Sequence, residues 1–190
     1  MSWNVINLGA VTPTPWKNGR GVTRELVAWP NADEWIWRMS VAEVAQSGPF
    51  SRFEGVQRWF AVVSGAGVKL HTDGVLRTVG ADSDPICFDG AAATDCELID
   101  DTTQDFNLMV RGDQIRTQML RIAEPIEIQI SDSTTIAVFA MKSRARIEFN
   151  SLNIEIDPGI LIWRDVKRGD QIRVNATCAL FITMEDQQQP

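Results

Sequence analysis

Short apolar or alternating runs, separated by turn residues, fill most of this 190-residue chain and constrain its fold more than any other feature. No window of a dozen residues keeps apolar side chains at the three- and four-residue spacing of a helix. Turn signals such as Asp73-Gly74 and Asp157-Pro158-Gly159 separate the runs. Strands this short and evenly spaced are typical of a β barrel or sandwich. The expected strands are residues 58–63, 67–70, 75–79, 97–99, 106–111, 117–122, 126–130, 136–141, 145–149, 154–156, 160–163, 170–175 and 179–184.

A faint repeat relates the two halves of the chain. The run that begins at Phe60 is followed by strand-like runs at residues 67–70, 75–79 and 85–88. The run that begins at Ile136 is followed in the same way by residues 145–149, 153–156 and 160–163. Duplication of a small barrel explains this shared order economically, although strand patterns are common enough for chance to compete.

Charge and apolar patterning exclude several classes of partner. The formal charge is −7 and the sequence pI is near 4.7, which disfavours binding to phosphate backbones, so no nucleic acid is expected. The longest apolar stretches, such as residues 160–163, are far too short to cross a bilayer. The residues from Met1 to Asn4 lack the basic start and apolar run of a secretory signal, and the three cysteines are odd in number and widely spaced. We therefore expect reduced thiols and a cytoplasmic protein without a membrane partner. The sequence does not predict the oligomeric state.

A metal centre is not expected, and neither is a cofactor. Catalytic metal sites in small barrels need two or three histidines and a carboxylate on adjacent strands. The chain has one histidine, His71, which precedes the hairpin turn at Asp73-Gly74 and is expected to be solvated. No two cysteines have zinc-ligand spacing.

The glycine-rich stretch Asn18-Gly19-Arg20-Gly21 differs from a phosphate-binding loop. Such a loop ends in Gly-Lys-Ser or Gly-Lys-Thr and opens a helix, whereas residues 22–27 have a strand pattern. The glycines are therefore expected to allow positive φ angles or close backbone approach at the mouth of a barrel. Arg20 then either takes a permitted φ or alters the local pocket.

Four ordered motifs resemble the HutD/Ves family of small bacterial proteins. They are residues 15–25 (Pro-Trp-Lys-Asn-Gly-Arg-Gly-Val-Thr-Arg-Glu), 37–44, 48–58 and 105–111. The sequence departs from the family pattern at Arg20, where the family usually carries another glycine. The second half of the chain matches the family in pattern more than in residues.

The resemblance implies an all-β fold, a cupin-like (RmlC-like jelly-roll) double barrel or bicupin. It also implies a role in histidine utilisation or in stress response, in a family without a proven reaction that is thought to bind a small metabolite. We expect residues 1–118 to form an N-terminal cupin-like barrel with the ligand pocket. Residues 119–190 are expected to form a supporting C-terminal barrel, because the chemically suggestive residues lie between Trp16 and Arg111.

Four arginines within these motifs are candidates for binding an anion: Arg24, Arg38, Arg58 and Arg111. Arginine matches carboxylate geometry with two parallel hydrogen bonds, and an arginine inside a barrel is costly unless it is paired. Each therefore meets an internal Asp or Glu or awaits the carboxylate of a ligand. Arg58 is the first choice because it opens a strand directly after a glycine-containing turn. The expected ligand-binding residues are Arg58, Asn18, Lys17, Arg38, Arg24, Ser51, Glu43, Phe50, Trp16, Asn107 and Arg111, with Phe53 completing an apolar wall.

The sequence thus predicts a metal-free protein that binds a small organic carboxylate and acts as a regulator or metabolite buffer. A urocanate- or formylglutamate-like ligand follows from the family resemblance alone. The alternative is a metal-independent enzyme that uses Glu43 and Arg58 for proton transfer on a small acid, although an ion pair between Glu43 and an arginine inside the barrel is the favoured interpretation of Glu43. Ser51 would need the only histidine as its base, so no catalytic residue is assigned. A scaffold that binds a protein through its tryptophans is a third, weaker option.

Overall fold

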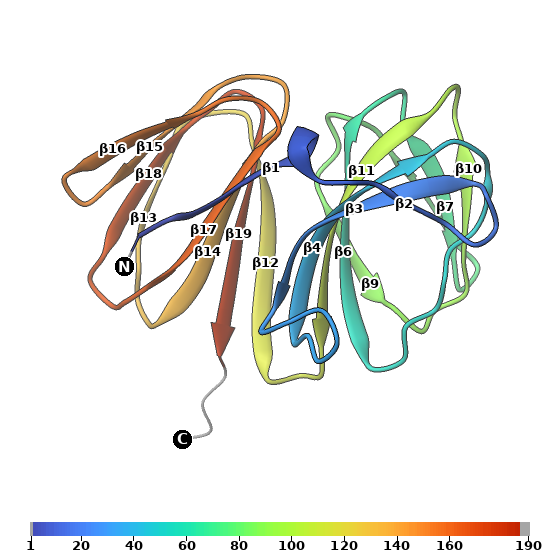
Figure 1. The fold of residues 1–190 in the computed structure, drawn as a ribbon, viewed down its shortest axis with the longest axis horizontal. Coiled ribbons are helices and arrows are strands. Elements are labelled where there is room, and N and C mark those ends of the chain that lie inside the picture. Colours follow the sequence, from blue (N-terminus) through green and yellow to red (C-terminus); the bar gives the residue numbers. More distant parts are fainter. Residues whose placement is uncertain (1, 187–190) are drawn as a thin grey trace. The chain divides into compact units, whose positions relative to one another are not determined.

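The structure, a computed structural model, describes residues 2–186, and its regular secondary structure is almost entirely β-strand (Figure 1). The chain divides into two compact units. The first unit consists of residues 11–112, and the second joins residues 2–10 to residues 113–186. The expected boundary after residue 118 falls inside a strand of the second unit, β12 (Ile115–Ile122). Residues 2–10 belong to the second unit because β1 (Asn4–Asn7) pairs with residues 160–163.

The first unit is built from two antiparallel sheets. One has six strands in the order β2-β3-β4-β11-β6-β9, and the other has four in the order β5-β10-β7-β8. The strands are β2 (Thr14–Pro15), β3 (Gly21–Trp29), β4 (Trp37–Val44), β5 (Gly48–Pro49), β6 (Val56–Ser64), β7 (Val68–Thr72), β8 (Val75–Val79), β9 (Ile86–Asp89), β10 (Thr94–Leu98) and β11 (Thr103–Arg111).

The second unit also has two antiparallel sheets, in the orders β1-β17-β14-β19-β12 and β13-β18-β15-β16. A three-residue 3-10 turn, η1 (Leu8–Ala10), follows β1. The remaining strands are β13 (Ile126–Gln129), β14 (Thr134–Ala140), β15 (Ala145–Phe149), β16 (Leu152–Ile156), β17 (Ile160–Val166), β18 (Gln171–Asn175) and β19 (Ala179–Asp186). The all-β class predicted from the sequence is confirmed, and each predicted strand is present, with the predicted ends in β8 and β15 and with ends within a few residues of the prediction in the others.

Alternation along the strands separates core-facing from outward-facing side chains in both units. In β10, Thr94 and Cys96 are buried while Asp95 and Glu97 are exposed. In β15, Ala145, Ile147 and Phe149 are buried. Apolar core clusters among the described residues include a large one in the second unit and smaller ones in the first, around Phe60 and Leu70 and around Trp35 and Met109.

Among residues 2–186, no helix has the length and apolar character that crossing a membrane requires.

Candidate anion-binding cavity

A cavity of about 570 Å³ lies in the first unit. That volume is within the range of small-molecule pockets. Strands β3, β4, β6 and β11 form its wall, and two segments, residues 15–18 and 49–53, complete it. It is lined by Pro15, Trp16, Lys17, Asn18, Thr23, Arg38, Ser40, Ala42, Pro49, Phe50, Ser51, Phe53, Arg58, Asn107 and Met109.

The glycine-rich segment closes into a tight turn beside the cavity. The Gly19 amide donates to the Trp16 carbonyl, and the Trp16 amide donates to the Gly21 carbonyl. Gly19 has a φ of +70°, and a Cβ on Gly21 would collide with the Glu43 carbonyl, so both predicted glycine roles are confirmed. Arg20 keeps a negative φ and donates from Nη1 to the Ser47 carbonyl at 2.8 Å. It therefore fixes the neighbouring loop and does not line the cavity.

Strand alternation sets which polar side chains enter the cavity. On β4, Arg38 and Ser40 point inward, and on β11, Asn107 and Met109 do so. Met109 is paired with Arg38 on one side and with Arg58 on the other. The two guanidinium groups therefore stand on the same face of the sheet, two strands apart.

Arg58 is the most deeply buried cation of the cavity, with 7% of its surface exposed. Its Nε and Nη2 donate to Asn107 Oδ1 at 3.0 and 2.7 Å. Its Cζ lies 4.6 Å from the ring centre of Phe50 and 5.5 Å from that of Phe88. Burial lowers the Arg58 pKa to about 10, although Asp105 opposes this shift, so the side chain stays cationic at neutral pH. Arg58 forms no ion pair with any carboxylate in the described part of the chain.

Asp105 lies in the interior next to this arginine, fully buried on β11. Its Oδ2 accepts a hydrogen bond from the Thr103 hydroxyl at 3.0 Å, and its Oδ1 is buried without a partner. The backbone carbonyl of Asp105 accepts a bond from Asn107 Nδ2. Burial raises the Asp105 pKa to about 7, against the opposing effects of Thr103 and Arg58. The register between β11 and β6 shifts at this residue, and such a bulge re-aims side chains.

Arg38 has a more solvated environment. Its Nη1 lies 3.6 Å from Glu25 Oε2 in a half-exposed ion pair, and its Cζ stacks on Trp35 and Phe53 at 4.8 and 5.2 Å. The Nε atom is buried without a hydrogen-bond partner. Desolvation lowers the Arg38 pKa, and Arg111 adds to this while Glu25 opposes it. The guanidinium retains donor capacity toward the cavity.

The structure gathers eight of the eleven expected ligand-binding residues around this cavity. They are Trp16, Lys17, Asn18, Arg38, Phe50, Ser51, Arg58 and Asn107, together with the expected wall residue Phe53.

Three expected residues lie elsewhere. Arg24 and Glu43 point to the opposite face of the sheet, because Ala42 next to Glu43 is the residue that lines the cavity. They form a 3.9 Å ion pair with each other. Arg111 stacks on Trp35 at 4.2 Å, outside the lining. Glu43 and Arg58 are thus on opposite faces, and the arrangement required for proton transfer between them and one substrate is not formed.

A metal ion does not fit the donor set of this cavity. The lining residues include no His, Cys, Asp or Glu, and three of them are cations, Lys17, Arg38 and Arg58. Across residues 2–186, no group of three or more His, Cys, Asp or Glu side chains is arranged to hold a metal ion. Cupin-like folds that use a metal need such ligands to converge inside the barrel.

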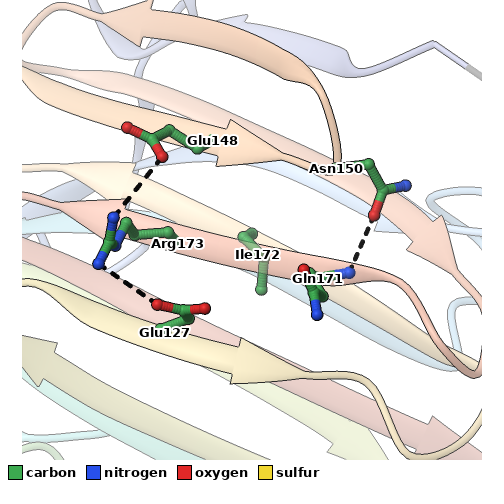
Figure 2. A pocket seen from close by; sticks show the side chains of 6 residues that line it. All are labelled: Glu127, Glu148, Asn150, Gln171, Ile172 and Arg173. Carbon is green, nitrogen blue, oxygen red and sulfur yellow. Dashed lines mark hydrogen bonds and ion pairs between the residues drawn. The ribbon is translucent and has the colours of Figure 1, made fainter.

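A smaller depression of about 80 Å³ lies on the surface of the second unit (Figure 2). Arg173 reaches Glu127 Oε2 at 3.4 Å and Glu148 Oε2 at 4.0 Å, as Figure 2 shows. The backbone N–H of Gln171 donates to Asn150 Oδ1 at 3.0 Å. These side chains satisfy one another on a solvated strand face, so the depression has the character of a surface ion-pair network.

Sequence reasoning missed the polar groups that lie behind the residues lining the cavity. Asp105 and Thr103 precede Asn107 on the same face of β11, so their alternation with Asn107 was the available signal. Thr23 accepts a 2.8 Å hydrogen bond from Trp16 Nε1 and holds the indole at the cavity wall. Phe88 stacks on Arg58 from β9, and no local pattern links these two residues.

Comparison with known proteins identifies relatives over nearly the whole chain. The HutD family model matches residues 9–184. An uncharacterised 21.2 kDa protein in the hutC 3′ region of Pseudomonas putida is 30% identical over 143 residues, which span 74% of this chain and 75% of that protein. Protein Ves of Cronobacter sakazakii is 36% identical over 110 residues, covering 57% of this chain and 60% of its own length.

Solved structures give the same result. HutD from Pseudomonas fluorescens SBW25 has a TM-score of 0.86 and 25% identity, covering 98% of this chain and 100% of that one. Salicylate 1,2-dioxygenase from Pseudoaminobacter salicylatoxidans has a TM-score of 0.62 at 8% identity, covering 96% of this chain and 81% of that one, and shows the fold alone. The cupin-like fold expected from the sequence is confirmed.

Proposed function

Because the chain belongs to the HutD family, we propose that its first unit binds a small organic carboxylate without a metal ion. In this proposal the protein acts in the cytoplasm as a regulator or metabolite buffer in histidine utilisation or stress response. A relative in the hutC 3′ region supports the histidine context. The relatives named Ves support the stress-response context, which the family resemblance implies.

The observation that carries the proposal is a buried cation without a carboxylate partner. Arg58 donates two hydrogen bonds to the neutral amide of Asn107 and is otherwise packed between the rings of Phe50 and Phe88. A desolvated guanidinium is costly to leave unpaired, and a carboxylate from outside would form a charge-assisted bond in a low-dielectric site.

Other lining residues suit the remainder of a short organic acid. Lys17 and Asn18 are exposed at the glycine-rich turn and supply donors to a second polar group. Trp16 and Phe50 pack edge to face at 6.4 Å, which gives the cavity a rigid apolar wall. Urocanate and N-formylglutamate combine a carboxylate with a polar remainder of a size that such a cavity accommodates.

Isothermal titration calorimetry with urocanate and with N-formylglutamate tests the proposal. We expect heat from at least one of them, and at least about a hundredfold weaker binding in Arg58→Gln, because a charged hydrogen bond in a dry site is lost. Arg24→Gln is the matched control, since it removes a guanidinium from the opposite face of the same sheet. An absence of heat with both acids and an unchanged melting temperature would remove these ligands. Equal losses in the two variants would show that the cavity is not where the acid binds.

A further inference from the structure

We propose that Asp105 is a positioning residue of the anion site, which takes up a proton when a carboxylate binds at Arg58. Ligand binding and protonation of the protein are then coupled through one buried guanidinium. This inference rests on the proposed function and adds to it a titrating group that does not line the cavity.

Hydrogen bonds through Asn107 connect Arg58 to the backbone carbonyl of Asp105, and the Asp105 carboxylate acts on Arg58 through its charge. Arg58 is held by Asn107 Oδ1, and Asn107 Nδ2 is in turn held by the Asp105 carbonyl at 3.0 Å. The Asp105 carboxylate lies on the same face of β11 and has one satisfied oxygen, Oδ2, bonded by Thr103. The other oxygen, Oδ1, is buried and has no hydrogen-bond partner. An ionised carboxylate would leave that oxygen unsolvated, whereas a neutral acid has a proton on one oxygen and a weaker need for donors.

Few charged groups face this carboxylate. Arg58 faces it from β6 and Cys96 from β10, and Arg38 from β4 acts on Arg58. The residues paired with Asp105 on either side, Ala42 and Val62, are apolar. Burial raises the Cys96 pKa to about 12, so that thiol stays neutral. Arg58 is therefore the group whose charge sets the balance between the acid and the carboxylate form of Asp105.

Burial disfavours the charged forms of both Asp105 and Arg58. Desolvation raises the Asp105 pKa and lowers the Arg58 pKa, and in each case it exceeds their mutual attraction. A ligand carboxylate at Arg58 would neutralise the one cation that favours the charged form of Asp105, and would add a like charge nearby. Both effects raise the Asp105 pKa further, so binding draws a proton from solution.

The coupling has a definite direction with pH. Because protonated Asp105 leaves Arg58 free for the ligand, affinity is highest on the acid side of the Asp105 pKa and falls as the pH rises through it. Each unit by which the ligand raises that pKa corresponds to about a tenfold change in affinity between the two limits.

Calorimetry in buffers of different ionisation enthalpy measures the proton directly. The probe is N-formylglutamate, whose own groups do not titrate between about pH 6 and pH 9. At pH 7.5 we expect the apparent enthalpy to depend on the buffer with a slope of roughly 0.3 to 0.7 protons taken up per ligand bound. The slope should vanish in Asp105→Asn, and that variant should bind with an affinity that is flat from about pH 6 to pH 9. The exposed Asp82→Asn is the matched control and should keep the wild-type slope.

A second readout keeps the inference testable if Asp105→Asn does not fold. Carbon-13 NMR of the side-chain carboxyl in the wild-type protein gives the Asp105 pKa with and without the probe, and we expect a rise of about one unit or more on binding. Heat of binding that is the same in every buffer, or an Asp105 pKa unmoved by the probe, overturns the coupling and leaves carboxylate binding intact. No heat at any pH with either N-formylglutamate or urocanate overturns the proposed function, and the coupling with it.

Discussion

The two units have the same strand order but differ in what fills them. Four strands of the larger sheet run in the order β4-β11-β6-β9 in the first unit and β12-β19-β14-β17 in the second. The smaller sheets run β5-β10-β7-β8 and β13-β18-β15-β16. Each strand of one series therefore has a counterpart in the other, displaced by a constant step in strand number. This correspondence supports the duplication interpretation of the faint sequence repeat.

The difference lies in the inward side chains of equivalent strands. On β6 and β11 they include Arg58, Asp105 and Asn107, whereas on β14 and β19 they include Val138 and Phe181. The first set has polar atoms that need partners and encloses a cavity. The second set packs into one apolar cluster. Burial of unpaired polar groups costs free energy, so the first unit is organised at the expense of its own stability, as is common for binding sites.

The largest expected effect concerns the second unit, whose interior is packed with apolar side chains. Phe181→Ala should lower the free energy of unfolding by about 3 to 5 kcal/mol, because it leaves a cavity in a packed core. Chemical denaturation followed by circular dichroism measures this loss. Leu152→Ala in the same unit is the control, since Leu152 is 61% exposed and should cost less than about 1 kcal/mol. A small loss in Phe181→Ala would mean that the second unit is loosely packed and that the contrast between the units is wrong.

The next effect concerns the pH dependence of stability in the first unit. The folded-state pKa of Asp105 is raised from 3.8 to about 7, so the folded protein holds its proton more tightly than the unfolded chain. This stabilisation is complete below the unfolded pKa and is lost as pH rises through the folded one. Relative to the wild type, Asp105→Asn should gain roughly 2 to 4 kcal/mol between pH 4 and pH 8.

Denaturation curves of the two proteins at four or more pH values measure this difference. Asp82→Asn should follow the wild type throughout, because its side chain is exposed. Parallel curves for Asp105→Asn and wild type would show that the buried carboxylate is ionised in the folded protein throughout this range.

Much of the fold was predictable from the sequence because strand signals are local. The alternation at Ala145–Phe149 and the turn at Asp73-Gly74 give β15 and the β7–β8 hairpin directly. The division of the chain into two units was harder to predict from the sequence. Its position depends on the pairing of Asn4–Asn7 with residues about 155 positions away, and such a long-range pairing has no local signature.

The candidate site, like the fold, was predictable from the sequence only in part. Arg38, Arg58 and Asn107 were predicted because each lies in a strand whose alternation is visible. Arg24 and Glu43 were included because each lies within a family motif, and alternation along β3 and β4 turns both away from the cavity. Asp105 was missed although its alternation with Asn107 is visible in the sequence, because its importance comes from burial and from an unpartnered oxygen, which the packed structure reveals.

A third effect separates binding from stability at Arg58. Arg58→Met replaces a desolvated charge by an apolar chain of similar length, and the relief of charge burial is offset by the loss of both donors to Asn107 Oδ1. We expect a change in unfolding free energy within about 1 kcal/mol, together with at least a hundredfold loss of N-formylglutamate affinity in calorimetry. A loss of several kcal/mol with unchanged affinity would instead assign Arg58 to holding the first unit together.

The smallest expected effect tests whether the second unit is functionally silent. Arg173→Gln removes the cation that connects Glu127 and Glu148 in the depression of Figure 2. Because these groups are more than a third exposed, the change in unfolding free energy should stay below about 1 kcal/mol. Affinity for N-formylglutamate should equal that of the wild type, since every residue lining the cavity belongs to the first unit. Calorimetry on Arg173→Gln beside Arg58→Met makes the comparison direct, and weaker binding in Arg173→Gln would show that the second unit takes part in recognition.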